Sequence, residues 1–285
     1  MILDDIVARR RQRVAEKKEQ MPQGELERQA AAAAAPRDFR AALDWRMDAV
    51  TAAEGPDESR LRRGESRLRR VALLAEIKPA SPVKGRMRME FDAMSIAQSY
   101  AEAGVDALSV LTEPDFFLGD AATLARLRRE FSLPLLCKDF IIDPYQVYEA
   151  RALGADAVLL IVSVLRDESL GQLLYLTHQL GMAALVEVDG ETTLGRAAEA
   201  GATIIGINNR DLRTFQTDLL NTERLAPLVP AGATVVSESG IKSAADMGHL
   251  FDLGVQAALV GEALVRATDV TAKARELLKG GRGGG

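Results

Sequence analysis

Apolar and polar positions along the chain follow a pattern that repeats four times. The phrases "AGVDALSVL" from 103, "LGADAVLLI" from 153, "AGATIIGIN" from 200 and "LGVQAALVG" from 253 each read as a helix end, a glycine and then a strand. Their glycines lie 47 to 53 residues apart. One βα unit needs only about 20 to 25 residues, so a further strand is expected midway in each interval.

Short apolar runs bounded by Gly or Pro occur at those midpoints: "SLPLLCKDF" from 132, "MAALVEVD" from 182 and "ATVVSES" from 233. With "VALLAEI" from 71 the strands number eight, and each is followed by a helical pattern. The sequence therefore predicts a (β/α)8 TIM barrel. A doubly wound open sheet is the alternative, but no G-x-G-x-x-G follows the first strand, so a dinucleotide site lacks its main support.

Four segments are expected along the chain. Residues 1–50 hold an amphipathic helical pattern over 3–20 and predict an N-terminal helical segment that caps the barrel. Residues 51–70 are charged and aperiodic, which predicts a mobile loop, and the barrel is expected over 71–279. The Gly-rich tail at 280–285 is expected to be disordered.

Composition narrows the class of protein. A hydrophobic content of 47% with 27% charged residues is typical of a globular protein, and a net charge of −5 disfavours binding to nucleic acid or to anionic membranes. No apolar stretch is long enough to span a bilayer. One cysteine and two histidines exclude an intramolecular disulfide and a zinc or iron cluster, so no metal is expected. We expect a protein of the reducing cytoplasm.

Polar side chains stand at the ends of five of the predicted strands, where apolar residues are expected. The active site of such a barrel lies at the C-terminal ends of its strands. A single polar residue there is often a solvated charge or an ion pair. A coincidence over five strands instead indicates a catalytic rim, made of Glu76, Lys78, Lys138, Glu187, Asn208 and Glu238.

Lysine usage points to chemistry at two of these positions. Of 36 basic residues only 8 are Lys, so most positive charges on the surface are expected to come from arginine. Arg does not release a proton near neutral pH, whereas a partly desolvated Lys can have its pKa lowered and act as an acid. Cys137 must face away from Lys138, which predicts a packing role. His178 and His249 lie in predicted helices and are not expected to be catalysts.

The last two strands carry glycines that fit a phosphate site. "SESG" at 237–240 and "LVGEALVR" at 259–266 each precede a helical pattern. Barrels of this kind bind phosphate there through backbone N–H groups at a helix N-terminus. Because a carboxylate would repel phosphate, the side chain of Glu262 is expected to point away.

The order of these motifs resembles the indole-3-glycerol phosphate synthase family of tryptophan biosynthesis. The resemblance covers about residues 3–268 and rests on "AEIKPASPVKG", "LTEPDFFLGD", "LLCKDFI", "LVEV", "GINNRDL", "SESGI" and "VGEALVR". It implies ring closure of 1-(2-carboxyphenylamino)-1-deoxyribulose 5-phosphate to indole-3-glycerol phosphate, with loss of carbon dioxide and water. The implied partner is this phosphorylated small molecule, and no cofactor or metal is implied.

The resemblance also implies residue roles. Lys138 resembles the general acid, Glu187 the base for dehydration, and Lys78 the lysine that contacts the substrate carboxylate, while Glu76 is positioned to orient one of the two lysines. The implied substrate-binding positions are Ser81 beside the aromatic ring, Asn208, Arg210, Glu238 and Ser239. The implied phosphate-binding positions are Ser239, Gly240, Gly261 and, through its backbone, Glu262. The implied apolar wall is Phe116 or Phe117, with Leu111, Leu160 and Leu185.

The sequence departs from the family pattern at two places, and two other functions remain as alternatives. Val83 stands where the family often has serine, and the 51–70 segment is longer than usual. Phosphoribosylanthranilate isomerase, a neighbouring barrel enzyme, would be expected to show a catalytic cysteine and aspartate at strand ends. A non-enzymatic phosphometabolite-binding barrel would need only the phosphate loops and Arg210, and would not explain Lys78, Lys138 and Glu187.

Overall fold

A computed structural model of the protein describes residues 2–44, 70–210 and 216–282. Eight parallel strands close into a barrel in the order β1-β10-β9-β8-β7-β6-β5-β4. This confirms the predicted (β/α)8 barrel, and each strand falls within a run predicted from the sequence. The strands are β1 (Ala72–Ile77), β4 (Ala107–Leu111), β5 (Leu135–Lys138), β6 (Ala157–Ile161), β7 (Ala183–Val188), β8 (Ile204–Asn208), β9 (Thr234–Glu238) and β10 (Ala257–Val260).

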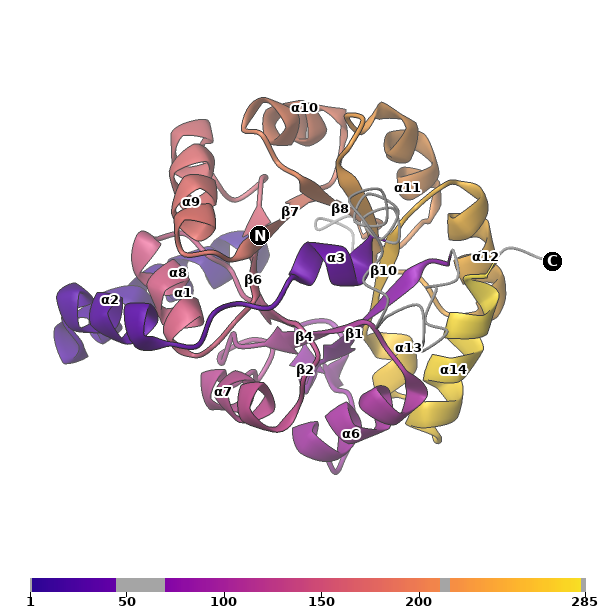
Figure 1. Ribbon diagram of the computed structural model, residues 1–285, viewed down its shortest axis with the longest axis horizontal. Helices are drawn as coiled ribbons and strands as arrows, with labels where there is room; N and C mark the ends of the chain where they lie inside the picture. Colours follow the sequence, from indigo (N-terminus) through magenta and orange to yellow (C-terminus); the bar gives the residue numbers. More distant parts are fainter. Residues whose placement is uncertain (1, 45–69, 211–215, 283–285) are drawn as a thin grey trace, which may run out of the picture.

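Helices surround the barrel as an outer ring (Figure 1). They are α6 (Ala93–Ala103), α7 (Ala121–Glu130), α8 (Pro144–Ala152), α9 (Asp167–Gln179), α10 (Glu191–Glu199), α11 (Leu220–Leu225) with the short 3-10 helix η1 (Ala226–Leu228), α12 (Ala244–Asp252), α13 (Glu262–Val265) and α14 (Val270–Gly280). Several begin at a side-chain cap: the carboxylates of Asp92, Asp120 and Asp143 accept a backbone N–H of the first turn of α6, α7 and α8. These caps fix where the helices start.

Strand residues divide between two apolar layers because their side chains alternate. One layer fills the barrel interior and includes Leu74, Leu136 and Leu185. The other lies between strands and helices and includes Leu73 and Leu135. The barrel strands are buried on both faces, which explains why their sequences read as nearly continuous apolar runs.

The N-terminal segment reaches both ends of the barrel. It consists of α1 (Ile2–Gln20), α2 (Gln23–Ala32) and α3 (Phe39–Leu43). Phe39 and Leu43 of α3 are fully buried against the first residues of several strands, so α3 lies across the N-terminal opening of the barrel (Figure 1). Helix α1 instead contacts loops at the C-terminal end, where Arg10 pairs with Asp139, directly after β5.

The Gly-rich tail differs from its prediction. Helix α14 runs to Gly280, and the carbonyl of Gly281 accepts the N–H of Val71 at 2.9 Å. A Cβ at position 280 would lie 2.1 Å from the carbonyl oxygen of Ala244. This glycine therefore allows α12 and α14 to approach, so a composition typical of disorder serves packing instead. Residues 283–285 lie outside the described residues, as does the expected loop except Arg70, which pairs with Asp106 at 2.8 Å.

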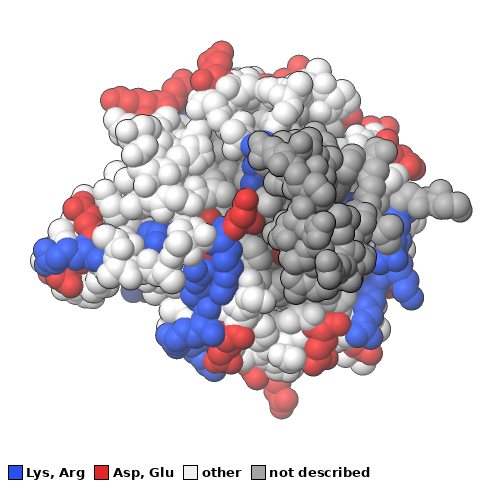
Figure 2. Space-filling model, in the orientation of Figure 1, with Lys and Arg blue, Asp and Glu red and all other residues white. Residues whose placement is uncertain are grey.

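A small hairpin that the sequence did not predict follows β1. It pairs β2 (Ala80–Ser81) with β3 (Gly85–Arg86) and lies beside the end of the first barrel strand. Figure 2, in the orientation of Figure 1, shows acidic and basic side chains interspersed around the edge of the face on which α3 lies. None of the helices in the described ranges is long and apolar enough to cross a membrane.

Candidate active site

A cavity of about 530 Å³ opens at the C-terminal ends of the barrel strands. Six strand ends and the hairpin supply its polar lining. The residues singled out from the sequence that line it are Glu76, Lys78, Ser81, Phe117, Lys138, Glu187, Asn208, Arg210, Glu238, Ser239, Gly240, Gly261 and Glu262. Residues as far apart in sequence as Glu76 and Glu262 thus face one space.

Lys138 lies between two carboxylates in the wall of the cavity. Its Nζ is 3.0 Å from Oε2 of Glu187 and 2.8 Å from Oε2 of Glu238. Glu187 comes from β7 and Glu238 from β9, so the ammonium joins strands that are not neighbours in the barrel. All three side chains are held by β-strands, which limits their movement relative to one another.

Two glycines make room for the buried carboxylates. A Cβ at Gly206 of β8 would lie 2.0 Å from Oε1 of Glu238. A Cβ at Gly261, after β10, would lie 2.4 Å from Oε1 of Glu76. Any other residue at either position would displace a carboxylate.

Glu76 and Lys78 form a second pair at the end of β1, with Nζ of Lys78 2.6 Å from Oε1 of Glu76. Burial by itself would raise the pKa of Glu76. The charges of Lys78, Lys138 and Arg210 outweigh burial and hold its pKa below the ordinary value. Glu76 is therefore a charged carboxylate that stabilises the charged forms of the nearby lysines.

The pKa of Lys138 differs from the sequence-based expectation. Burial opposes the charged form, as expected, but Glu187, Glu238 and Glu76 more than compensate and raise the pKa of Lys138 above its ordinary value. The expectation of a lowered pKa was wrong because it counted desolvation without the three carboxylates. In this structure the side chain of Lys138 is a charged ammonium group.

Two carboxylates share this one ammonium, and one of them, Glu238, is a weaker acid than an ordinary glutamate. Burial and the charge of Glu187 raise the pKa of Glu238, although Lys138 lowers it. Its Oε1 has no hydrogen-bond partner among the described residues. A buried carboxylate oxygen without a hydrogen bond is costly when charged, which agrees with the raised pKa of Glu238.

Asn208 connects the base candidate to Arg210. Its Nδ2 donates to Oε1 of Glu187 at 3.0 Å, and its Oδ1 accepts the backbone N–H of Arg210 at 3.0 Å. The Nε of Arg210 is buried and has no hydrogen-bond partner within the described part of the chain. Asn208 thus orients Glu187 and fixes the start of the loop that carries Arg210.

The proposed phosphate end has an unusual backbone. Ser239 and Gly240 both have positive φ, 67° and 86°, directly after β9. Such a conformation is readily adopted by glycine and rarely by serine. Consecutive residues of this kind turn backbone N–H groups toward one side, which suits an anion.

Glu262 does not point away from the cavity as expected. Its carboxylate binds Nζ of Lys84 and lies 3.7 Å from Nε of Arg266 and 3.9 Å from Nη2 of Arg210. Burial alone would raise the pKa of Glu262, but Lys84 outweighs it and the pKa is lowered. These cations neutralise the carboxylate, so its charge does not exclude an anion from this part of the cavity.

The apolar wall is made by two phenylalanines and by residues of the barrel interior. Phe117 and Phe140 pack with ring centroids 5.9 Å apart at an interplanar angle of 38°. Leu111 lines the cavity as expected, and Phe117 rather than Phe116 does so. The prediction for Leu160 is corrected: its side chain packs between strands and helices, and its neighbours Leu159 and Ile161 line the cavity. Leu185 lies in the barrel interior, outside the cavity lining.

Sequence reasoning missed several lining residues. Lys84 could have been found, because it is another of the few lysines and stands in "SPVKG". Phe140 belongs to the quoted "LLCKDFI" motif but was not singled out. Ile2, Leu3 and Ile6 of α1 also line the cavity. Nothing in their local pattern indicated this, because it depends on where α1 docks.

The single cysteine lies outside the cavity. Cys137 packs between strands and helices, on the face opposite Lys138, and burial raises the pKa of its thiol to about 12. A thiol with this pKa is not a nucleophile at neutral pH. Among residues 2–44, 70–210 and 216–282, no group of three His, Cys, Asp or Glu side chains is placed to hold a metal ion.

Known proteins share this sequence over its length. The profile of a family described as Indole-3-glycerol phosphate synthase matches residues 3–277. The indole-3-glycerol phosphate synthase of Dehalococcoides mccartyi (strain CBDB1) is 55% identical over 213 residues, which cover 74% of this chain and 82% of that protein. That of Roseiflexus sp. (strain RS-1) is 46% identical over 284 residues, 97% of each chain.

Among solved structures, 3-hexulose-6-phosphate synthase from Salmonella typhimurium superposes with a TM-score of 0.61. It is 17% identical and covers 74% of this chain and 98% of its own, so this likeness shows the barrel fold alone. The family match, by contrast, spans the N-terminal helices, the strand ends and the residues that line the cavity. This chain therefore belongs to the indole-3-glycerol phosphate synthase family.

Proposed function

We propose that this protein is an active indole-3-glycerol phosphate synthase, a carboxy-lyase of tryptophan biosynthesis, with Lys138 as general acid and Glu187 as base. The substrate is 1-(2-carboxyphenylamino)-1-deoxyribulose 5-phosphate. The observation that carries the proposal is the charged Lys138 held between two buried carboxylates on the wall of a cavity that is apolar on one side and cationic on the other.

Ring closure is the first step. The aromatic carbon that bears the carboxylate attacks the ribulose carbonyl carbon, and Lys138 gives a proton to the carbonyl oxygen, which becomes a hydroxyl group. Loss of carbon dioxide then returns the C–C bonding electrons to the ring and restores its aromaticity. Glu187 and Glu238 favour the ammonium form of Lys138 before this transfer, so the donor is charged at neutral pH.

Dehydration is the second step. The new hydroxyl leaves as water with a proton from Lys78, and a base takes a proton from the ring that has just formed. Glu187 is suited to this task because Asn208 and Lys138 fix both of its oxygens. An oriented carboxylate contributes to catalysis through position as well as basicity.

The lining of the cavity supports one orientation of the substrate. Phe117 and Phe140 receive the aromatic ring, with Ser81 beside it. Lys78 attracts the substrate carboxylate, and Arg210 with Asn208 holds the polar chain. The phosphate binds the backbone of Ser239, Gly240, Gly261 and Glu262, near the cation of Lys84.

The two rival functions fit these observations less well. An isomerase of the neighbouring type needs a cysteine at the cavity, whereas Cys137, the only cysteine in the chain, is buried on the other face. A barrel that only binds phosphometabolites gains nothing from the buried triad of Lys138, Glu187 and Glu238. Burying three charges is costly, and chemistry at this point gives a reason for it.

An assay of the purified protein with the carboxyphenylamino substrate tests the proposal. Indole-3-glycerol phosphate is expected to form and is followed by its indole fluorescence. Lys138→Met should keep the circular dichroism spectrum and lose roughly a hundred- to ten-thousand-fold in kcat. Absence of product with the wild-type protein would refute the activity, and activity of Lys138→Met within a few-fold of wild type would refute the role of Lys138.

A further inference from the structure

A buried ion pair ties helix α1 to the residue after Lys138. Nη2 of Arg10 is 2.7 Å from Oδ2 of Asp139, and the two side chains are only 3% and 4% exposed. Asp139 stands between Lys138 and Phe140, which the proposed reaction uses as acid and as ring contact. Neither Arg10 nor Asp139 has a part in that reaction.

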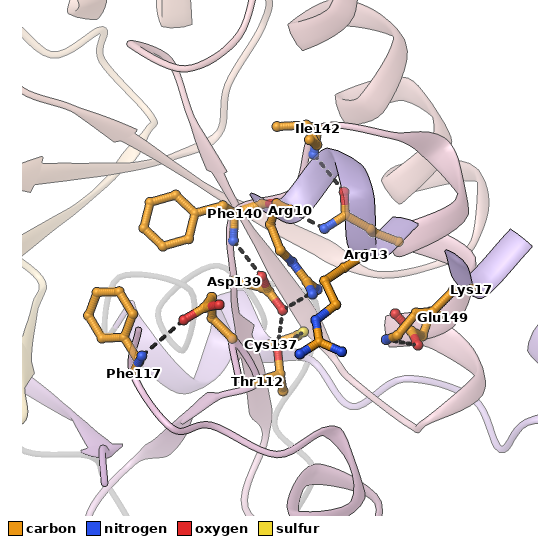
Figure 3. A network of polar contacts seen from close by, with 12 residues as sticks. Arg10, Arg13, Lys17, Thr112, Phe117, Cys137, Asp139, Phe140, Ile142 and Glu149 are labelled. Atoms are coloured by element: carbon orange, nitrogen blue, oxygen red, sulfur yellow. Dashed lines mark hydrogen bonds and ion pairs between the residues drawn. The ribbon is translucent and has the colours of Figure 1, made fainter. Parts of the chain in front are cut away.

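Two further hydrogen bonds fix the position of Asp139 (Figure 3). Its Oδ2 also accepts the hydroxyl of Thr112 at 2.7 Å, and its Oδ1 accepts the backbone N–H of Phe140 at 2.7 Å. The backbone N–H of Thr112 in turn donates to the carbonyl of Lys138 at 3.1 Å. The Asp139 carboxylate therefore holds the backbone after Lys138, and Thr112, which binds the same carboxylate, holds the carbonyl of Lys138.

A second contact of α1 reaches the other aromatic wall. Arg13 donates to both oxygens of Asp115, at 2.7 and 3.1 Å. Asp115 lies two residues before Phe117, in a loop whose backbone N–H groups bind the carboxylate of Glu113. Because Ile2 and Ile6 of the same helix line the cavity, α1 contacts the site at several points.

Stability alone does not explain a charged pair at this position. Removing two charges from water is costly, and replacing a buried ion pair by neutral residues is often neutral or stabilising. A pair of this kind instead specifies one arrangement of the elements that it joins. Here those elements are α1 and the end of β5, which carries Lys138.

We propose that Arg10 is a positioning residue for the reaction: by binding Asp139 it sets the place of Lys138 and Phe140, and so couples the docking of α1 to catalysis. The inference rests on the proposed function. It extends the working site to a residue in the N-terminal segment, more than a hundred residues from Lys138 in sequence.

Four variants separate positioning from stability. Arg10→Met leaves Asp139 as a buried charge without its cation. The double variant Arg10→Met with Asp139→Asn removes both charges and keeps an amide for Thr112 and Phe140. Arg10→Lys keeps a cation, which is sufficient because only one nitrogen of Arg10 contacts Asp139. Lys18→Met removes a more exposed pair between α1 and Asp143 and serves as the matched control.

The measurements are kcat and KM for the carboxyphenylamino substrate, with thermal unfolding of each variant. Arg10→Met is expected to lower kcat roughly 10- to 100-fold, the effect of a misplacement of about 1 Å. The double variant should regain thermal stability but keep the low kcat. Arg10→Lys should recover kcat to within about fivefold of wild type, and Lys18→Met should match wild type in kcat and KM.

Two results would overturn the proposal. One is a double variant with the kcat of wild type, since Arg10 would then serve stability only. The other is an equal loss of kcat in Arg10→Lys and Arg10→Met, because the cation would then be irrelevant. An inactive wild-type protein would instead count against the proposed function, so the two failures are distinguishable.

Discussion

The proposed acid and the proposed base are in direct contact. Glu187, the proposed base for dehydration, is one of the carboxylates that keep Lys138, the proposed acid for ring closure, charged. Glu187 binds Lys138 through one oxygen and Asn208 through the other. When Lys138 gives up its proton, the attraction that it exerts on Glu187 disappears. Lys138 is then a neutral amine beside the carboxylate that is proposed to act in dehydration.

Glu187→Gln isolates the second step at the scale of one residue. The amide keeps the shape of the side chain and loses the basic oxygen. We expect the ring-closed intermediate to accumulate in single-turnover quench experiments, while Lys138→Met accumulates only substrate. Detection of substrate alone in both variants would assign Glu187 to the first step.

Glu238 predicts a pH dependence of stability. Its pKa in the folded protein is raised to about 7 from an ordinary 4.5, mainly by burial. The folded protein therefore holds a proton that the unfolded chain has released. This stabilisation is complete below pH 4.5 and is lost as the pH rises through about 7.

Glu238→Gln should remove that dependence. The difference in free energy of unfolding between wild type and variant is expected to change by on the order of 1 to 3 kcal/mol between pH 5 and pH 8. Urea unfolding at several pH values measures it. Other titrating groups are common to both proteins and cancel, so parallel pH curves would contradict the raised pKa of Glu238.

At the scale of elements, the site depends on how closely neighbouring strands present their side chains. Gly206 of β8 lies beside Glu238 of β9, and the missing side chain is the space that the carboxylate fills. Gly261 does the same for Glu76 of β1. In both cases a glycine on or directly after a neighbouring strand leaves the space that a buried carboxylate occupies.

Gly206→Ala tests this arrangement. A Cβ 2.0 Å from Oε1 of Glu238 must push the carboxylate away from Lys138, so we expect kcat to fall at least tenfold with the protein still folded. Gly195→Ala is the matched control, since a Cβ in that helix meets nothing within 4 Å. Unchanged kcat in Gly206→Ala would show that Glu238 can move without cost.

At the scale of the whole molecule, the N-terminal end of the barrel is closed by apolar packing, and the candidate active site lies at the C-terminal end. Helix α3 buries Phe39 and Leu43 at the N-terminal end, and the cavity opens at the C-terminal end. The apolar interior of the barrel separates the two. A change at one end should therefore leave the other largely intact.

Leu43→Ala should lower the free energy of unfolding by about 2 to 5 kcal/mol, because Leu43 is fully buried and leaves a cavity. The kcat of the folded variant should stay within about twofold of wild type. Leu228→Ala, at a position that is 54% exposed, should change stability by less than about 0.5 kcal/mol. Urea unfolding and steady-state kinetics check both, and a large loss of kcat in Leu43→Ala would show that the two ends are coupled.

Much of the site was predictable from sequence because strand ends in a parallel barrel share one rim. Once eight strands are recognised, Glu76, Lys138, Glu187 and Glu238 must come together whatever the detailed packing. The prediction was wrong for Leu160, which was expected to face the cavity and instead packs between strands and helices. Alternation alone cannot fix that face in strands that are buried on both sides.

The sequence by itself determined the barrel, its eight strands and the rim where charged residues gather, because these follow from local periodicity and from the geometry of parallel strands. Only the tertiary structure decided that Lys138 keeps its proton, since its pKa depends on three carboxylates from other strands. The same holds for α1, whose Arg10 reaches Asp139 across the fold. The position of a docked helix and the combined effect of several charges depend on distances between atoms in the folded protein. The spacing of residues along the chain does not determine those distances.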